Sequence, residues 1–152
     1  MKEAEPKSTI NIDITISHQQ LEDMLVTALE GGSNYWYRNA GYDIPEERMG
    51  EARKQAGSCF LGYAAPFCGG KLTLEVIHDD VLPRRTSSVS YEDVKGGSGE
   101  TWEIELEDLV YGCQIMAEKY TRHLMDMVNE NHDAETADVF LQCCCFGEVI
   151  YG

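Results

Sequence analysis

The sequence predicts a single α+β domain, in which an antiparallel sheet of four to six strands is packed on one face by three to four helices. Residues 9–16 alternate between isoleucine and polar residues, as a half-buried strand does. Residues 108–129 repeat apolar side chains at the spacing of an amphipathic helix. Strands and helices do not alternate regularly, which argues against a parallel α/β fold. With 152 residues, 43% of them hydrophobic, residues 9–152 suit one domain after a flexible, polar segment 1–8.

The N-terminal part of this domain should be a strand followed by a helix. The strand covers residues 9–16, with all its isoleucines on one face. A helix should start after Ser17, because Ser17 and Gln20 have the spacing of a capping box. Gly31 and Gly32 should end this helix, since glycine adopts the left-handed conformation of a C-cap without strain.

The middle of the chain should supply most of the sheet. Residues 45–56 suit a short polar helix that begins at a proline and is closed by a glycine. Cys59–Ala65 and Lys71–His78 are interpreted as strands on either side of a turn. Residues 87–94 and 100–106 are interpreted as a second hairpin, the latter with alternating apolar residues.

Two helices are expected in the last third. The first covers residues 108–129, and the second covers residues 133–146 and stops at Gly147. Residues 139–146 are apolar nearly all round, which is typical of a helix buried on several sides, either in the centre of the fold or at a subunit interface. We expect the turn that carries Trp36 to close over this last helix.

Two short segments each allow a structural and a functional interpretation. In Tyr35-Trp36-Tyr37-Arg38, either the tryptophan fills the core and the tyrosines cover its edge, or the segment is a stacking platform for a flat ligand. Arg84-Arg85 is either part of a solvated loop that pairs locally with acids, or an anion clamp for a phosphate group.

The net charge narrows the class of partner. The chain has 27 acidic and 12 basic residues, a formal charge of −15, and about two thirds of it lies in residues 100–152. Such a charge repels nucleic acid and acidic membranes and attracts basic surfaces. A basic partner is therefore expected to contact the acids of the strand and helix in this region: Glu100, Glu103, Glu105, Glu107, Glu118 and Asp126.

Neither metal binding nor catalysis has a clear signature. The six cysteines lack the paired spacing of a zinc site and are interpreted as buried, reduced thiols. His78-Asp79-Asp80 is the best candidate for acid–base or metal chemistry, but a polar triplet that closes a strand is mostly an ordinary turn. We therefore expect no cofactor, no metal, no catalytic residue and no enzymatic activity. No apolar signal or membrane-spanning segment is visible, so a cytoplasmic location is expected.

Three segments together carry a family resemblance. Leu25–Trp36 (LVTALEGGSNYW), Asp133–Gln142 (DAETADVFLQ) and Phe146–Gly152 (FGEVIYG) resemble a family of small uncharacterised proteins encoded by bacteriophages and prophages. The resemblance implies a phage accessory gene expressed in the bacterial cytoplasm. It implies no established activity.

Three functional hypotheses follow. The leading one is an anti-defence, anti-CRISPR-like inhibitor whose acidic C-terminal half docks on a basic, nucleic-acid-binding surface of a host defence protein such as a CRISPR effector. The first alternative is an oligomeric sponge for a nucleotide defence signal, with its subunit contact on residues 139–146. Its ligand would be held by Trp36, Tyr37, Arg38, Arg84 and Arg85. The second alternative is a small metal-dependent enzyme around His78-Asp79-Asp80.

Overall fold

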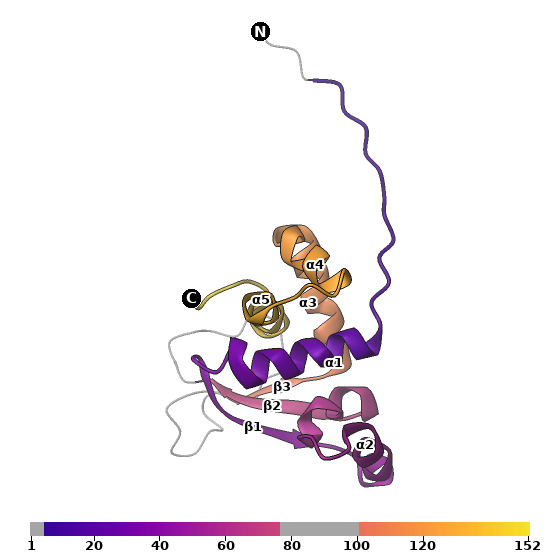
Figure 1. Ribbon diagram of the computed structural model, residues 1–152, viewed down its shortest axis with the longest axis vertical. Coiled ribbons are helices and arrows are strands. Elements are labelled where there is room, and N and C mark those ends of the chain that lie inside the picture. Colours follow the sequence, from indigo (N-terminus) through magenta and orange to yellow (C-terminus); the bar gives the residue numbers. More distant parts are fainter. Residues whose placement is uncertain (1–4, 77–100) are drawn as a thin grey trace.

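The computed structural model describes residues 5–76 and 101–152, which form an α+β fold (Figure 1). In chain order the elements are α1 (His18–Thr27), η1 (Ala28–Gly32), β1 (Tyr37–Asp43), η2 (Glu46–Arg48), α2 (Met49–Ala56), η3 (Leu61–Tyr63), η4 (Ala65–Cys68), β2 (Lys71–Val76), β3 (Thr101–Ile104), α3 (Leu106–Lys119), α4 (Thr121–Val128) and α5 (Ala134–Phe146). Here η1 is a π-helical turn, and η2, η3 and η4 are 3-10 turns.

The sheet has three antiparallel strands in the order β1-β2-β3 among the described residues. In the central strand Leu72, Leu74 and Val76 are buried, and Trp102 and Ile104 of β3 are buried beside them. Figure 1 shows α1, α3, α4 and α5 on one side of this sheet. The expected packing of helices on one face is therefore present. Four to six strands were expected; one of them, residues 87–94, lies outside the described residues.

The other face of the sheet is polar. Arg38 of β1 forms an ion pair with Glu75 of β2, and Asn39 donates a 2.7 Å hydrogen bond to the same carboxylate. Lys71 of β2 lies 2.9 Å from Glu103 of β3. On this polar face, the strands are joined by ion pairs and hydrogen bonds between their side chains. On the opposite face, the apolar side chains pack against the helices.

The centre of the core is α5, as its sequence predicts. Side chains 139–146 are at most 7% exposed within the single chain. The helix begins at Asp133, whose carboxylate accepts a 2.9 Å hydrogen bond from the Thr136 amide, and Gly147 follows it with a φ of 75°. Because these side chains are already covered, residues 139–146 offer no apolar surface to a second copy.

Two expected strands are absent from the described structure. Residues 9–16 form no strand; they run as an extended arm away from the body of the molecule (Figure 1). Their alternation is that of a half-buried strand, but no described strand pairs with them. The expected strand Cys59–Ala65 is also absent: residues 61–68 fold into the 3-10 turns η3 and η4, and residues 62–66 are all buried, without the alternation of a half-exposed strand.

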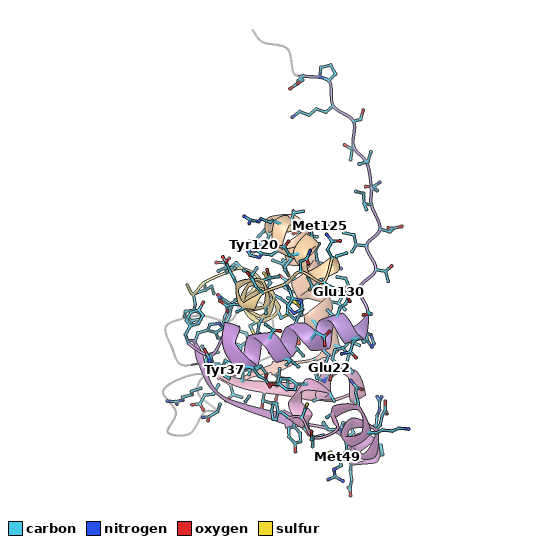
Figure 2. All side chains as sticks on the ribbon, viewed as in Figure 1. Glu22, Tyr37, Met49, Tyr120, Met125 and Glu130 are labelled. Atoms are coloured by element: carbon cyan, nitrogen blue, oxygen red, sulfur yellow. The ribbon has the colours of Figure 1, made fainter. Side chains whose placement is uncertain are left out.

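Two helix ends also differ from expectation. The predicted helix 108–129 is broken at Tyr120, which has φ −134° and ψ 50°, so that α4 leaves the direction of α3 and contacts α1 and α5 (Figure 2). The first helix has the predicted capping box, in which the Gln20 amide donates to Ser17 Oγ over 3.1 Å. It does not end through a left-handed glycine. Gly32 is instead a point of close approach, since a Cβ there would lie 2.5 Å from the carbonyl oxygen of Ala134.

Candidate functional site

An acidic cleft lies where β3 passes into α3. Glu105 is the N-cap of α3, and its amide donates a 2.8 Å hydrogen bond to the buried Asp108 in a reciprocal capping arrangement. This cap fixes Glu105 and Glu107 at the rim of a hollow of about 400 Å³. The hollow, called the acidic cleft below, is lined by Arg48, Pro66, Phe67, Gly69, Gly70, Glu105, Leu106 and Glu107.

The cations beside the acidic cleft are already paired. Lys71 Nζ lies 2.9 Å from Glu103 and 4.0 Å from Glu105, and its hydrogen bond to Glu103 raises the pKa of Lys71. Arg48 binds both oxygens of Glu51 at 3.1 and 3.0 Å, which raises the pKa of the arginine and lowers that of the glutamate. Glu107 is exposed and takes part in none of these pairs. Carboxylates therefore outnumber cations around the hollow.

The walls of the cleft suit a lysine or arginine side chain. Pro66, Phe67 and Leu106 give it apolar surface, against which the aliphatic stem of a long basic side chain can pack. The carboxylates of Glu105 and Glu107 can then accept hydrogen bonds from the charged head group. The cleft can thus receive a cation on a protein surface, and its charge disfavours a phosphate.

Only part of the predicted acidic surface belongs to this cleft. Glu103, Glu105 and Glu107 are close together. Glu118 lies eleven residues after Glu107 on α3, which corresponds to about 16 Å along the helix axis. Asp126 is half-buried on α4. Glu100 lies outside the described residues. The linear list of acids therefore separates into one cluster and two isolated positions.

The aromatic segment does not form an open platform. Trp36 is fully buried and its ring stacks on Tyr151 at a centroid distance of 5.7 Å. Tyr37 is half-buried and donates through its hydroxyl to the Leu29 carbonyl, and Arg38 is engaged with Glu75. These side chains point to three different environments. The first interpretation, in which the tryptophan fills the core, describes the structure. Arg84 and Arg85, the other residues of the sponge hypothesis, lie outside the described residues.

A polar cluster that the sequence reading missed ties three distant segments together. The Asp138 carboxylate of α5 accepts hydrogen bonds from Ser33 Oγ (2.8 Å), Trp36 Nε1 (2.7 Å) and Tyr35 OH (2.6 Å). One turn later, Gln142 Oε1 accepts from the amides of Ile150 and Tyr151 at 2.7 and 2.8 Å. The expectation that the Trp36 turn closes over the last helix is confirmed. A signal was present: Asp138 and Gln142 are four residues apart, and Gln142 is the one polar side chain in the apolar run 139–146.

This cluster, which we call the Asp138 clamp (Ser33, Tyr35, Trp36, Asp138 and Gln142), borders a hollow of about 300 Å³. Both oxygens of Asp138 already accept two hydrogen bonds, since Gln142 Nε2 also donates to Oδ2 at 3.1 Å. The pKa of Tyr35 is raised to about 12 by burial and by its hydrogen bond to Asp138. The clamp is therefore saturated by its own donors and acts as a structural joint.

The six cysteines form no disulfide, and most of them are covered. Cys68 and Cys143 to Cys145 are buried, Cys113 is half-buried and Cys59 is exposed. Burial raises the pKa values of Cys113 and Cys143 to about 12. Within residues 5–76 and 101–152, no three His, Cys, Asp or Glu side chains are grouped to hold a metal ion. His78-Asp79-Asp80 lies outside those ranges.

The comparisons with known proteins give no relative. No protein-family model, no curated protein and no solved structure matched the chain. In the described part of the chain, no helix has both the length and the apolar composition needed to cross a bilayer.

Proposed function

We propose that this protein is a phage-encoded anti-defence protein that acts by binding. Its acidic cleft would dock on a basic, nucleic-acid-binding surface of a host defence protein, such as a CRISPR effector, in the bacterial cytoplasm. The main support is the exposed carboxylate of Glu107 beside Glu105, in a hollow whose neighbouring cations are already paired. The phage origin rests on the resemblance of the segments around Trp36, Asp138 and Tyr151.

Binding at this cleft would act by occupancy. A defence nuclease holds DNA or RNA phosphates with lysine and arginine side chains. Carboxylates on a rigid strand-to-helix junction can occupy the same positions, and the apolar walls can cover the stems of those side chains. Attraction between a chain of charge −15 and a basic groove speeds association, and salt weakens it. The nucleic acid itself is not a partner in this proposal.

The test is competition with DNA for a purified CRISPR effector. The wild-type chain should displace DNA from the effector, with a potency that falls as salt rises. Glu107→Lys should weaken this inhibition by at least about tenfold, because it places a like charge against the basic groove. Glu107 is exposed and outside the ion pairs of the cleft, so its substitution leaves the Lys71 contacts and the Glu105 cap in place.

A matched control is available on another helix. Glu135 is also an exposed acid in the first turn of a helix, α5, so Glu135→Lys changes the charge and the helix-dipole interaction equally. This variant should inhibit like the wild type. Equal inhibition by Glu107→Lys and the wild type would remove the cleft from the binding surface, and an effector panel with no displaced DNA would refute the proposed function.

A further inference from the structure

The N-terminal arm, residues 5–16, exposes an apolar stripe that a folded chain normally covers. Ile10 is 78% exposed, Ile12 72% and Ile14 40%. Figure 2 shows the arm standing clear of the body for most of its length. None of its residues belongs to a strand or helix, and among the described residues its backbone has no hydrogen-bonded partner strand. Ile10 and Ile12 are thus largely uncovered, and the main chain of this segment is open to pairing with another strand.

A matching apolar groove lies at the base of the arm. Its volume is about 350 Å³, and it is lined by Ile12, Ile14, Ile16, Leu21, Val110, Cys113, Gln114, Ala117 and Leu124. On α3, Val110 is 47% exposed in this groove. The lining contains no charged residue, although the chain as a whole has a charge of −15. The stripe and the groove form one continuous apolar surface.

We propose that this surface is the contact between two copies of the chain, in which the two arms pair as an antiparallel ribbon whose isoleucine face lies over both grooves. The uncharged groove permits this occupant. A second copy also carries −15, so it can approach closely only through uncharged surface, and the groove provides that surface. A basic partner would gain nothing from a groove without carboxylates.

The arm sequence is complementary to itself. An antiparallel register centred on Ile12 places Ile12 opposite Ile12 and Ile10 opposite Ile14 on the apolar face. On the polar face it places Asn11 opposite Asp13, which avoids two facing carboxylates. Each copy offers the same arm and the same groove, so one two-fold axis satisfies both and the assembly closes as a dimer. This contact is separate from the acidic cleft.

The first test is sedimentation equilibrium of the full chain across a range of concentrations. The mass should rise from 17.1 kDa towards twice that value. Raising the salt from about 0.05 M to about 0.5 M should strengthen the dimer, because it screens the repulsion between two acidic chains. A single 17.1 kDa species at every concentration, or a dimer that dissociates as salt rises, would overturn the proposal.

Matched variants locate the contact. Ile12→Asp and Val110→Asp change exposed side chains, one on each half of the contact, and each should raise the dissociation constant by at least about tenfold. Thr9→Asp adds the same charge to the polar face of the arm and should leave the dimer nearly intact. Far-UV circular dichroism checks that all three stay folded. Dimers of equal strength in Ile12→Asp and Thr9→Asp would refute the ribbon.

The register has its own test. In a background without the exposed Cys59 and the groove-lining Cys113 (Cys59→Ser with Cys113→Ala), Ile12→Cys should form an intermolecular disulfide under mild oxidation, because residue 12 faces its own copy. Asn11→Cys should not, since residue 11 faces residue 13. A disulfide in the Asn11→Cys chain in place of the Ile12→Cys chain would contradict this pairing.

Discussion

Trp36 donates a 2.7 Å hydrogen bond from its indole Nε1 to Asp138 Oδ1, and the two residues are 102 positions apart in the chain. The bond joins the turn between η1 and β1 to α5. Because Trp36 is fully buried and also stacks on Tyr151, the same side chain holds the C-terminal segment. Through this contact and the stacking on Tyr151, the segments Leu25–Trp36, Asp133–Gln142 and Phe146–Gly152 meet in one cluster.

Removal of the Asp138 carboxylate should destabilise the fold strongly. Asp138→Ala leaves the buried Ser33 hydroxyl and the buried Trp36 N–H without their acceptor, so the free energy of unfolding should fall by about 3 kcal/mol. Asp138→Asn keeps one acceptor oxygen and should lose less. Urea denaturation measures both values. Glu135→Ala, an exposed acid on the same helix, is the control and should change stability by less than about 1 kcal/mol. A loss of similar size in Asp138→Ala and Glu135→Ala would contradict the role of the clamp.

Gly112 should not tolerate a side chain, because α3 and α5 meet there. A Cβ at Gly112 would lie 2.4 Å from Cys144 Sγ and 3.1 Å from the Cys144 backbone nitrogen. Gly112→Ala should therefore lower the unfolding free energy by about 1–3 kcal/mol. Gly50 of α2 has open space around it, so Gly50→Ala should raise the same quantity by about 0.5–1 kcal/mol.

A double variant separates crowding from other effects at this helix contact. Cys144→Ala removes the sulfur that a Cβ at position 112 would touch, so it should recover part of the loss in Gly112→Ala. Thermal denaturation of the wild type, Gly112→Ala, Cys144→Ala and the double variant gives the coupling energy between the two positions. Strictly additive losses would show that Gly112→Ala acts by some route other than this contact.

The native thiols should differ sharply in reactivity. Cys59 is exposed, whereas burial raises the pKa values of Cys113 and Cys143 to about 12 and holds that of Cys144 well above its ordinary value. With Ellman's reagent at about pH 8, one thiol should react quickly and the others only as the chain unfolds. Cys59→Ser should remove the fast phase. A fast phase that survives this substitution would place a reactive thiol elsewhere.

Acid should weaken the ion pair on the polar face of the sheet. Hydrogen bonds from Arg38 and Asn39 lower the folded-state pKa of Glu75 below its ordinary value of 4.5. A lowered folded-state pKa contributes stability that is complete above the unfolded-state pKa and is lost as the pH falls through the folded-state value. The contribution of Glu75 should therefore be lost below about pH 4.5, so that between about pH 5 and about pH 3 the unfolding free energy falls less steeply in Glu75→Gln than in the wild type. Parallel curves for the two chains would contradict this contribution of Glu75.

Much of the local structure could be predicted from the sequence. The Ser17–Gln20 capping box, the cap at Asp133 and the stop at Gly147 all depend on hydrogen bonds or backbone angles within a few residues. The apolar stripe of residues 108–129 and the nearly all-round apolar surface of residues 139–146 were also recognised, because helical spacing shows which side chains share a face. These features depend on neighbouring residues in the sequence, so they can be predicted without knowledge of contacts between distant segments.

The errors fall where a partner from elsewhere in the chain decides the structure. β1 (Tyr37–Asp43) was missed because it is a mostly exposed edge strand with no apolar alternation, and it exists through its pairing with β2. Residues 9–16 have the alternation but no described strand beside them. The break at Tyr120 follows from the packing of α4 on α1 and α5, which helical spacing cannot show.

The sequence by itself determined the α+β class, the helix starts at Ser17 and Asp133, the stop at Gly147 and the acidic charge of the last third. Only the tertiary structure decided which acids meet: Glu105 and Glu107 share a cleft with η4, and Glu103 is joined to Glu105 through Lys71. Glu118 and Asp126 lie elsewhere. The tertiary structure also decided that Trp36 faces Asp138 and not solvent. The reason is physical: caps and periodic faces arise from neighbours along the chain, but a shared site depends on contacts between residues tens of positions apart.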